Sequence, residues 1–237
     1  MSLEQISPYF KSAIIASEDQ RFYSHNGLDY RRIVASLIDN IKSQKIVAGG
    51  STITQQLART IYLNNEKSII RKLKEAIIAR KIELSYSKEQ ILEAYLNCIY
   101  FGHNIYGIEE ASNYFFNKKP NQLTLGESAL LAGIISSPSH FSPDVDMEKS
   151  LAKQKQVLKK MLNQKKISAQ EYDSAINENL KFAFNKKYQF SNRNTLYFYD
   201  AIIDELKSNN VLKPNYKKMG VIINSTLDVE VNNIVNN

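Results

Sequence analysis

Apolar residues recur through most of residues 5–180 with the spacing of helix faces. The longest such stretch covers residues 67–86. A helix that is apolar on most of its circumference is typical of a buried position. We therefore expect residues 67–86 to form a central, buried helix of an all-α, mostly helical fold. Its apolar positions are Ile69, Ile70, Leu73, Ala76, Ile77, Ile78, Ile82 and Leu84.

Three further helices are predicted by a shared start signal. Each begins with Ser or Thr followed three residues later by Gln or Glu, the capping-box pattern in which two side chains satisfy the free amides of a helix start. The second of these helices runs to Ile135 and ends before Pro138, because proline cannot continue a helix. The three patterns are Ser87 with Gln90, Thr124 with Glu127, and Ser168 with Glu171.

The helical periodicity is lost near residue 181. Residues 195–206 again have helical spacing, Pro214 interrupts the chain, and the β-branched residues of 220–227 predict a strand. We therefore predict a helical domain over residues 1–180. Residues 181–237 are expected to form a helix and the start of a linker.

Composition and charge narrow the classes of function. Eight Gly and five Pro in 237 residues argue against collagen-like and turn-rich β proteins. A net charge of +7 favours an anionic partner, and nucleic acid, an acidic membrane and a phosphorylated substrate all fit it. The single cysteine, Cys98, excludes an internal disulfide, and no Cys/His metal motif is visible. No apolar run approaches the roughly 20 residues of a membrane-spanning helix.

The first candidate site follows an apolar helical run. Glu18 and Asp19 end that run and are followed by Phe22, His25 and Gly27. A carboxylate at the edge of the core can act as a general base. A solvated helix end explains an isolated Glu-Asp pair equally simply, so both interpretations stay open at this stage.

The second candidate site is the segment Gly49-Gly50-Ser51-Thr52 and the helix after it. Thr52 and Gln55 make another capping box, and Arg59 lies two turns further on. Free amides at a helix start can hold a phosphate or a sugar. The segment lacks the Lys-Ser/Thr of a nucleotide-binding P-loop. A capped helix start without a ligand is the alternative.

Two further groups lie on helices. On helix 67–86, Arg71 and Glu75 are four residues apart, so an intrahelical ion pair explains them. The alternative is that Glu75 is partly buried among cations and orients those cations toward a polyanion. The cations are Lys67, Arg71, Lys72 and Lys74. On the next helix, Glu93 and Asn97 share one face, and Cys98 is expected to be a small buried residue.

Taken in order, these segments resemble the peptidoglycan glycosyltransferases of glycosyltransferase family 51, the polymerase module of class A penicillin-binding proteins. Five motifs over residues 5–143 carry the resemblance. They are Glu18-Asp19-x-x-Phe22-x-x-His25-x-Gly27, Gly49-Gly50-Ser51-Thr52-Ile53-x-Gln55-Gln56-x-x-Arg59, Arg71-Lys72-x-x-Glu75, Ile91-Leu92-Glu93-x-Tyr95-Leu96-Asn97, and Ala129-Leu130-Leu131-Ala132-Gly133 with Ser137-Pro138.

The resemblance implies a lysozyme-like, two-lobed helical fold with a long cleft. It also implies the reaction, in which lipid II and a growing lipid-linked glycan strand are joined by a β-1,4 bond with inversion and loss of undecaprenyl pyrophosphate. Glu18 matches the general base and Glu75 the second catalytic position. The residues expected to bind substrate are Asp19, Phe22, His25, Ser51, Thr52, Gln55, Gln56, Arg59, Lys67, Arg71, Lys72, Lys74, Glu93 and Asn97.

Cofactor, inhibitor and membrane contact also follow from the resemblance. A divalent cation, Mg²⁺ or Mn²⁺, is expected between the substrate pyrophosphate and Glu18, and the phosphoglycolipid moenomycin is expected to bind. Arg59 departs from the lysine that is usual in the family. An apolar stripe over residues 33–41 suits contact with the bilayer, although packing against the body would explain it too.

The resemblance also places the domain on the outer face of the bacterial cytoplasmic membrane, held by a helix upstream of residue 1. Residues 223–228 resemble the entry to a transpeptidase linker. Three alternatives stay open: a lysozyme-like enzyme that cleaves glycans with Glu18 as acid, a basic helical nucleic-acid binder, and an inactive scaffold. A cluster of cations sized for pyrophosphate speaks against the first, and only the net charge supports the second.

Overall fold

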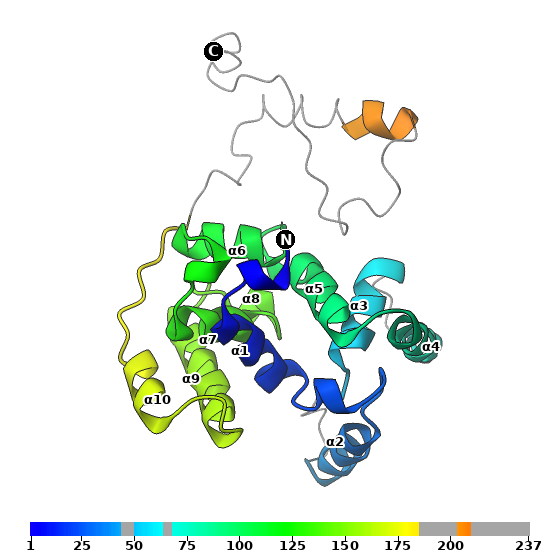
Figure 1. The fold of residues 1–237 in the computed structure, drawn as a ribbon, viewed down its shortest axis with the longest axis horizontal. Helices are drawn as coiled ribbons and strands as arrows, with labels where there is room; N and C mark the ends of the chain where they lie inside the picture. Colours follow the sequence, from blue (N-terminus) through cyan, green and yellow to red (C-terminus); the bar gives the residue numbers. More distant parts are fainter. Residues whose placement is uncertain (44–49, 64–67, 185–202, 210–237) are drawn as a thin grey trace.

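The computed structural model describes residues 1–43, 50–63, 68–184 and 203–209. These residues are mostly helical, with one two-stranded sheet, as predicted (Figure 1). The elements are η1 (Leu3–Gln5), α1 (Pro8–Glu18), η2 (Phe22–Ser24), α2 (Tyr30–Ser43), α3 (Ile53–Tyr62), α4 (Ile69–Ser85), α5 (Lys88–Cys98), β1 (Tyr100–Gly102), β2 (Ile105–Tyr106), α6 (Ile108–Phe116), η3 (Pro120–Gln122), α7 (Leu125–Ile134), α8 (Pro138–Phe141), α9 (Met147–Asn163) and α10 (Ala169–Ile176).

The predicted capping boxes are all present. Thr52, Ser87, Thr124 and Ser168 each accept a hydrogen bond from the backbone amide three residues later. In each case the Gln or Glu at that later position accepts from the amide of the cap in return. Because each box satisfies two amides that the helix leaves free, it fixes the first residue of the helix.

The core is centred on α7. All ten residues of α7 are buried, and the helix packs between α1 and α9 (Figure 1). Phe10 and Ile14 of α1 and Leu158 of α9 are fully buried in the same cluster. The helix predicted for residues 124–135 is therefore confirmed, and so is its end before Pro138.

The prediction that residues 67–86 form a central, buried helix is wrong. The helix exists as α4, but among its residues only Glu75, Ala79 and Ile82 are buried. Five large apolar side chains of α4 are 59–83% exposed: Ile69, Ile70, Leu73, Ile77 and Leu84. Figure 1 shows α4 at the periphery, next to α3. When apolar residues lie on every side of a helix, the sequence does not indicate which side packs against the protein. In α4 the side that packs against the protein also carries the Glu75 carboxylate.

A short hairpin, β1 and β2, was not predicted. Tyr100 pairs with Tyr106, and the turn between the strands has Gly102, His103 and Asn104 at φ of 92°, 51° and 60°. Positive φ at the centre of the turn matches the twist of a tight hairpin. The two residues after Gly102 are His and Asn rather than the usual Asn-Gly or Asp-Gly pair, which explains why the pattern gave no hairpin signal.

The chain beyond residue 184 is described only over residues 203–209. Residues 203–208 are helical, in agreement with the end of the helix predicted for 195–206, and Ile203 is buried. The rest of that helix and the strand predicted for 220–227 lie outside the described residues. The proposed boundary near residue 180 stays a prediction. Among the described helices, none combines the length and the apolar character needed to cross a bilayer.

Candidate functional site

Glu18 ends α1 and is joined to two other helices by a chain of hydrogen bonds. Its Oε2 accepts a 2.9 Å hydrogen bond from Nε2 of Gln56 on α3. The Oε1 atom of Gln56 accepts a 3.1 Å hydrogen bond from the hydroxyl of Tyr95 on α5. Segments that belong to three separate motifs of the sequence therefore meet at one carboxylate.

Tyr95 was not among the predicted site residues. The sequence analysis placed it in the fourth family motif and at an apolar position of a helix, without a role in the site, and it is indeed 2% exposed. A buried tyrosine hydroxyl nearly always finds a hydrogen-bond partner. That rule was the available signal, but it could not name Gln56 as the partner.

Two cations near Glu18 were also missed as parts of the site. Arg32 of α2 donates to the backbone carbonyl of Glu18, and Nζ of Lys160 on α9 donates to the carbonyl of Ser17 at 3.2 Å. Loss of hydration lowers the pKa of Lys160, and the nearby charge of Lys153 lowers it further. These cations come from distant parts of the chain, and they compensate the negative end of the α1 dipole.

Asp19 and Phe22 are fully buried behind Glu18. The two carboxylate oxygens of Asp19 lie 3.0 and 2.9 Å from Nε2 of His25, and one of them also accepts the backbone amide of Ile53 at 3.0 Å. The edge of the Phe22 ring faces the His25 ring. The structure thus brings these three predicted acceptor-site residues together as a packed turn. Contact between them and an acceptor stays a prediction.

The start of α3 is built from buried polar groups. Thr52 and Gln55, which form the capping box, are 0% and 3% exposed. The Thr52 hydroxyl also donates to the carbonyl of Gly27 at 2.6 Å. Gly27 has φ of +91°, and a Cβ atom there would come within 3.0 Å of the Ala79 carbonyl oxygen of α4. Thr52 and Gln55 therefore hold the helix start, and a direct role in ligand binding stays a prediction.

Beside the start of α3, the buried Glu75 carboxylate binds two cations, Arg71 and Lys72. Glu75 is fully buried; Arg71 donates to its Oε1 at 3.1 Å and Lys72 to its Oε2 at 2.6 Å. Nζ of Lys72 also lies 2.7 Å from Oγ of Ser51. The predicted intrahelical ion pair and the predicted burial of Glu75 are both confirmed. The side chain of Lys72 is 45% exposed and that of Arg71 is 16% exposed, so Lys72 is the more accessible of the two cations that this buried counterion holds.

The other predicted cations are placed differently. Arg59 lies one turn after Gln56 on α3, and its charge opposes the rise in the pKa of Tyr95 that burial causes. Lys74 is exposed, and it lies about 100° around α4 from the inward-facing Glu75. Lys67 lies outside the described residues.

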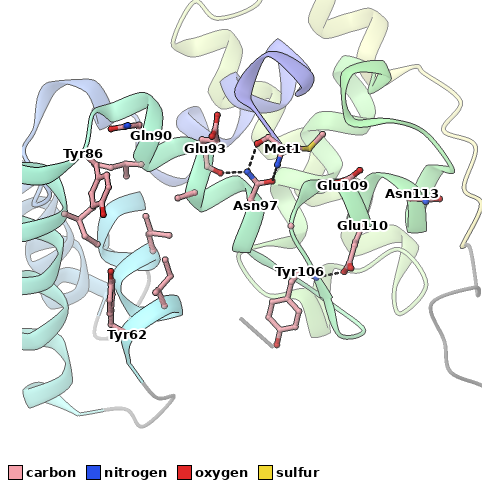
Figure 2. Close-up of a pocket in the computed structure, with 16 residues that line it drawn as sticks. Met1, Tyr62, Tyr86, Gln90, Glu93, Asn97, Tyr106, Glu109, Glu110 and Asn113 are labelled. Atoms are coloured by element: carbon pink, nitrogen blue, oxygen red, sulfur yellow. Dashed lines mark hydrogen bonds between the residues drawn. The ribbon is translucent and has the colours of Figure 1, made fainter. Parts of the chain in front are cut away.

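Glu93 and Asn97 hold the N-terminal segment. Oε2 of Glu93 accepts from the amide of Leu3 at 3.0 Å, and Nδ2 of Asn97 donates to the carbonyl of Met1 at 2.8 Å. Both residues line a cavity of about 1010 Å³ bordered by α3, α4, α5 and α6. Figure 2 shows the two side chains next to Met1 in this cavity. The structure therefore does not group them with Glu18, which is absent from the described lining, and substrate binding by them stays a prediction.

The carboxylates of the site are too few for a complete protein metal centre. Within the described residues, no three His, Cys, Asp or Glu side chains come together as metal ligands. Asp19 is engaged by His25, and Glu75 by two cations. Glu18 differs from both, because the described hydrogen bond to its carboxylate comes from a neutral amide, that of Gln56, while the charge of Lys160 lies nearby.

Cys98 has the structural role that the sequence predicted. It is 7% exposed, and burial raises the pKa of its thiol to about 12. A thiol with so high a pKa is not a nucleophile near neutral pH.

Comparison with known proteins places these features in a family. The family model described as Transglycosylase matches residues 1–162. Penicillin-binding protein 2D of Bacillus subtilis (strain 168) is 40% identical over 233 residues, which cover 98% of this chain and 34% of that protein. Penicillin-binding protein 1A of Aquifex aeolicus (strain VF5) is 40% identical over 202 residues, 85% of this chain and 27% of that protein.

A solved structure is also similar. The crystal structure of Penicillin-Binding Protein 1A from Haemophilus influenzae is 28% identical, covers 70% of this chain and 21% of that chain, and has a TM-score of 0.43. The chain spans 34% and 27% of the length of the two curated relatives. The chain therefore belongs to the transglycosylase family, which confirms the peptidoglycan glycosyltransferase domain predicted from the five motifs.

Proposed function

We propose that this domain polymerises lipid II into peptidoglycan strands, with Glu18 as general base. In this reaction the 4-hydroxyl oxygen of the acceptor sugar attacks the anomeric carbon of the lipid-linked donor. The bond between that carbon and the pyrophosphate oxygen breaks, the configuration inverts, and the hydroxyl proton passes to the Glu18 carboxylate. The electron pair leaves with undecaprenyl pyrophosphate.

One observation carries the proposal: helix α3 links the Glu18 carboxylate to the cations, because its Gln56 bonds Glu18 and its first turn adjoins Lys72 through Ser51. Departure of pyrophosphate concentrates negative charge, and cations positioned for it stabilise the transition state. Arg71 and Lys72 are held by the buried Glu75, and Arg59 follows Gln56 on α3. An enzyme that only cleaves glycans has no leaving group that requires these cations.

The Glu18→Gln variant tests the role of the base. The amide keeps the size of the side chain but cannot accept the proton, so lipid II polymerisation should fall by about 10²- to 10⁴-fold. Binding of the lipid substrate should be largely kept. The measurement is the rate of glycan-strand formation from purified lipid II, with substrate binding measured on both proteins.

Three outcomes would contradict the proposal. Equal polymerisation rates for the two proteins would remove Glu18 from the role of base. Cutting of preformed strands without polymer formation would favour the glycan-cleaving alternative. Absence of turnover in both proteins, together with tight duplex DNA binding that is insensitive to charge reversal at Arg59 and Arg71, would favour the nucleic-acid binder. Moenomycin should compete with the lipid substrate if the proposal is right.

A divalent cation forms part of the same proposal. Mg²⁺ or Mn²⁺ would have Glu18 as its protein ligand and would take its other ligands from the pyrophosphate oxygens, where it would neutralise the charge of the leaving group. Removal of divalent ions with EDTA should lower the polymerisation rate, and Mg²⁺ or Mn²⁺ should restore it. An unchanged rate in EDTA would exclude the ion.

Membrane contact is proposed through the outward face of α4 rather than only through residues 33–41. Of the latter stripe, Val34 is 55% exposed and Ile33 is half-buried, while the side chains of Leu37, Ile38 and Ile41 lie outside the described set. On α4, the exposed apolar side chains lie within about 100° of helix surface, because their positions follow a spacing of 3, 4 and 7 residues. Such an apolar stripe is typical of a helix that lies in a bilayer surface.

Charge selects an anionic lipid surface as the occupant. Lys74, Arg80 and Lys81 are exposed on or beside the apolar stripe, whereas the two acids of α4, Glu75 and Glu83, face the protein and are paired with cations. Cations that flank an apolar stripe favour anionic headgroups. This contact would hold the domain against a membrane, where a lipid-linked substrate is held, and the outer face is proposed from the family resemblance alone.

Vesicle co-sedimentation tests this contact. The Leu73→Gln, Ile77→Gln double variant should bind vesicles of anionic phospholipid less than the wild type does. Leu151→Gln, which replaces a leucine of α9 that is 41% exposed, is the matched control and should bind as the wild type does. Equal vesicle binding by all three proteins would contradict the assignment to α4.

A further inference from the structure

The Tyr95 hydroxyl is a buried polar group whose hydrogen bond leads directly to the proposed base. Tyr95 is 2% exposed within the apolar face of α5, between Leu92 and Leu96, which are also buried. Its hydroxyl lies 3.1 Å from Oε1 of Gln56. Phenylalanine would fill the same space without burying a polar atom, so the packing of the core gives no reason for the hydroxyl.

The direction of the hydrogen bonds in this chain is fixed by chemistry. An ionised carboxylate only accepts, so Gln56 must turn its NH₂ group toward Glu18. The amide oxygen of Gln56 then faces Tyr95, and the phenol must donate to it. Burial raises the pKa of Tyr95 well above its usual value, and the charge of Glu18 raises it further, so the phenol keeps its proton.

We propose that Tyr95 is a positioning residue for the transfer reaction, because its hydroxyl fixes the side-chain amide of Gln56 with the NH₂ group toward Glu18. This role depends on the proposed function, since it matters to turnover only if Glu18 is the base. Without the hydroxyl, the Gln56 amide is held at one end only, so its NH₂ group can move away from the Glu18 carboxylate. The Glu18 carboxylate then loses the donor that holds it in one orientation.

The Tyr95→Phe variant removes this one atom. We expect kcat for lipid II polymerisation to fall about tenfold, as the loss of one orienting hydrogen bond to the reacting group predicts. KM should stay unchanged, because the cations expected to bind the pyrophosphate, Arg59, Arg71 and Lys72, are not altered. A purely structural defect would instead lower the amount of active enzyme without a dependence on Gln56.

Tyr114→Phe is the matched control. Tyr114 is 3% exposed, and its hydroxyl lies 3.5 Å from Oδ2 of Asp144. It is therefore a second buried phenol, on α6 instead of α5, and its partner is a carboxylate instead of the Gln56 amide. Its removal should leave kcat unchanged.

A double-mutant cycle tests whether Tyr95 acts through Gln56. In a Gln56→Leu background, Tyr95→Phe should cause no further loss of kcat. A full tenfold loss in that background, or an unchanged kcat for Tyr95→Phe alone, would overturn the inference. The same is true of an equal loss for Tyr114→Phe.

Two further outcomes keep the test decisive. If thermal unfolding shows that Tyr95→Phe is not folded at the assay temperature, Gln56→Leu alone decides: kcat should fall, and an unchanged kcat overturns the inference. Failure of the proposed function is separate. It is recognised by a wild-type protein that does not polymerise lipid II, whereas an active wild type with a fully active Tyr95→Phe variant contradicts only the role of Tyr95.

Discussion

Helices α7 and α4 are both apolar over most of their circumference, yet one is the centre of the core and the other is at the surface. All ten residues of α7 are buried against α1 and α9. On α4, three of seventeen residues are buried, and one of them is the carboxylate Glu75. The same sequence property therefore has two structural outcomes.

The difference lies in what each helix turns inward. The buried residues of α7 are mostly small and apolar, including Gly126 and Gly133, which let neighbouring segments approach closely, and its one carboxylate, Glu127, belongs to the capping box and is paired with Lys118. The inward side of α4 carries Glu75 and Glu83, each with a cation partner. The first helix serves packing. The second holds Arg71 and Lys72 through Glu75, and five of its large apolar side chains are exposed.

The largest effect on stability is expected in α7. Leu130→Ala creates a cavity at a fully buried position, so the free energy of unfolding should fall by about 2–5 kcal/mol. Urea denaturation measures this change. A loss below about 1 kcal/mol would mean that α7 is not the packing centre that its burial indicates.

A smaller loss is expected at the inward face of α4. Glu75→Gln weakens two charge-assisted hydrogen bonds and removes the counterion of Arg71 and Lys72, so stability should fall by about 1–3 kcal/mol. Polymerisation of lipid II should fall as well, because the two cations lose their fixed positions.

Glu83→Gln is the control for that variant. Glu83 is also inward on α4 and paired, with Lys88 at 2.8 Å. It should lower stability to a similar extent while polymerisation is kept. If both variants lost turnover equally, Glu75 would have no role beyond stability.

The smallest effect is expected on the outward face of α4. Leu73→Gln with Ile77→Gln changes two side chains that are 62% and 59% exposed, and glutamine has a helix propensity close to that of the residues it replaces. The free energy of unfolding should therefore change by less than about 0.5 kcal/mol. A loss of 2 kcal/mol or more in urea denaturation would show that this face is covered within the protein.

Much of the fold could be predicted because its signals are local. The capping boxes at Thr52, Ser87, Thr124 and Ser168 each involve residues three apart, and all of them are present. The ion pair of Arg71 with Glu75 is equally local and was predicted as well. Such features depend only on residues three or four apart in one helix, so the spacing in the sequence is enough to predict them.

The features that were missed depend on contacts between distant residues. Tyr95 and Gln56 are 39 residues apart, and Lys160 and Ser17 are 143 apart. The bonds of Glu93 and Asn97 to the segment Met1–Leu3 were missed too, because no helical spacing could indicate them, while substrate binding by these two residues stays a prediction. The exposure of α4 was missed for the same reason. A sequence pattern identifies an apolar face, but it does not identify the element that packs against that face.

The hydrogen bond from the Ile53 amide to Asp19 has a consequence for how the domain opens. Helix ends usually fray, because their first amides have no partner within the helix. Here the first amide of α3 is tied to a buried carboxylate 34 residues earlier in the chain, and that carboxylate is the neighbour of Glu18. Fraying of α3 at this end would have to pull Asp19 out of the core. Thermal opening of α3 is therefore expected to start at Tyr62, the end remote from the base, and to leave Glu18 and Gln56 in contact until the whole unit unfolds.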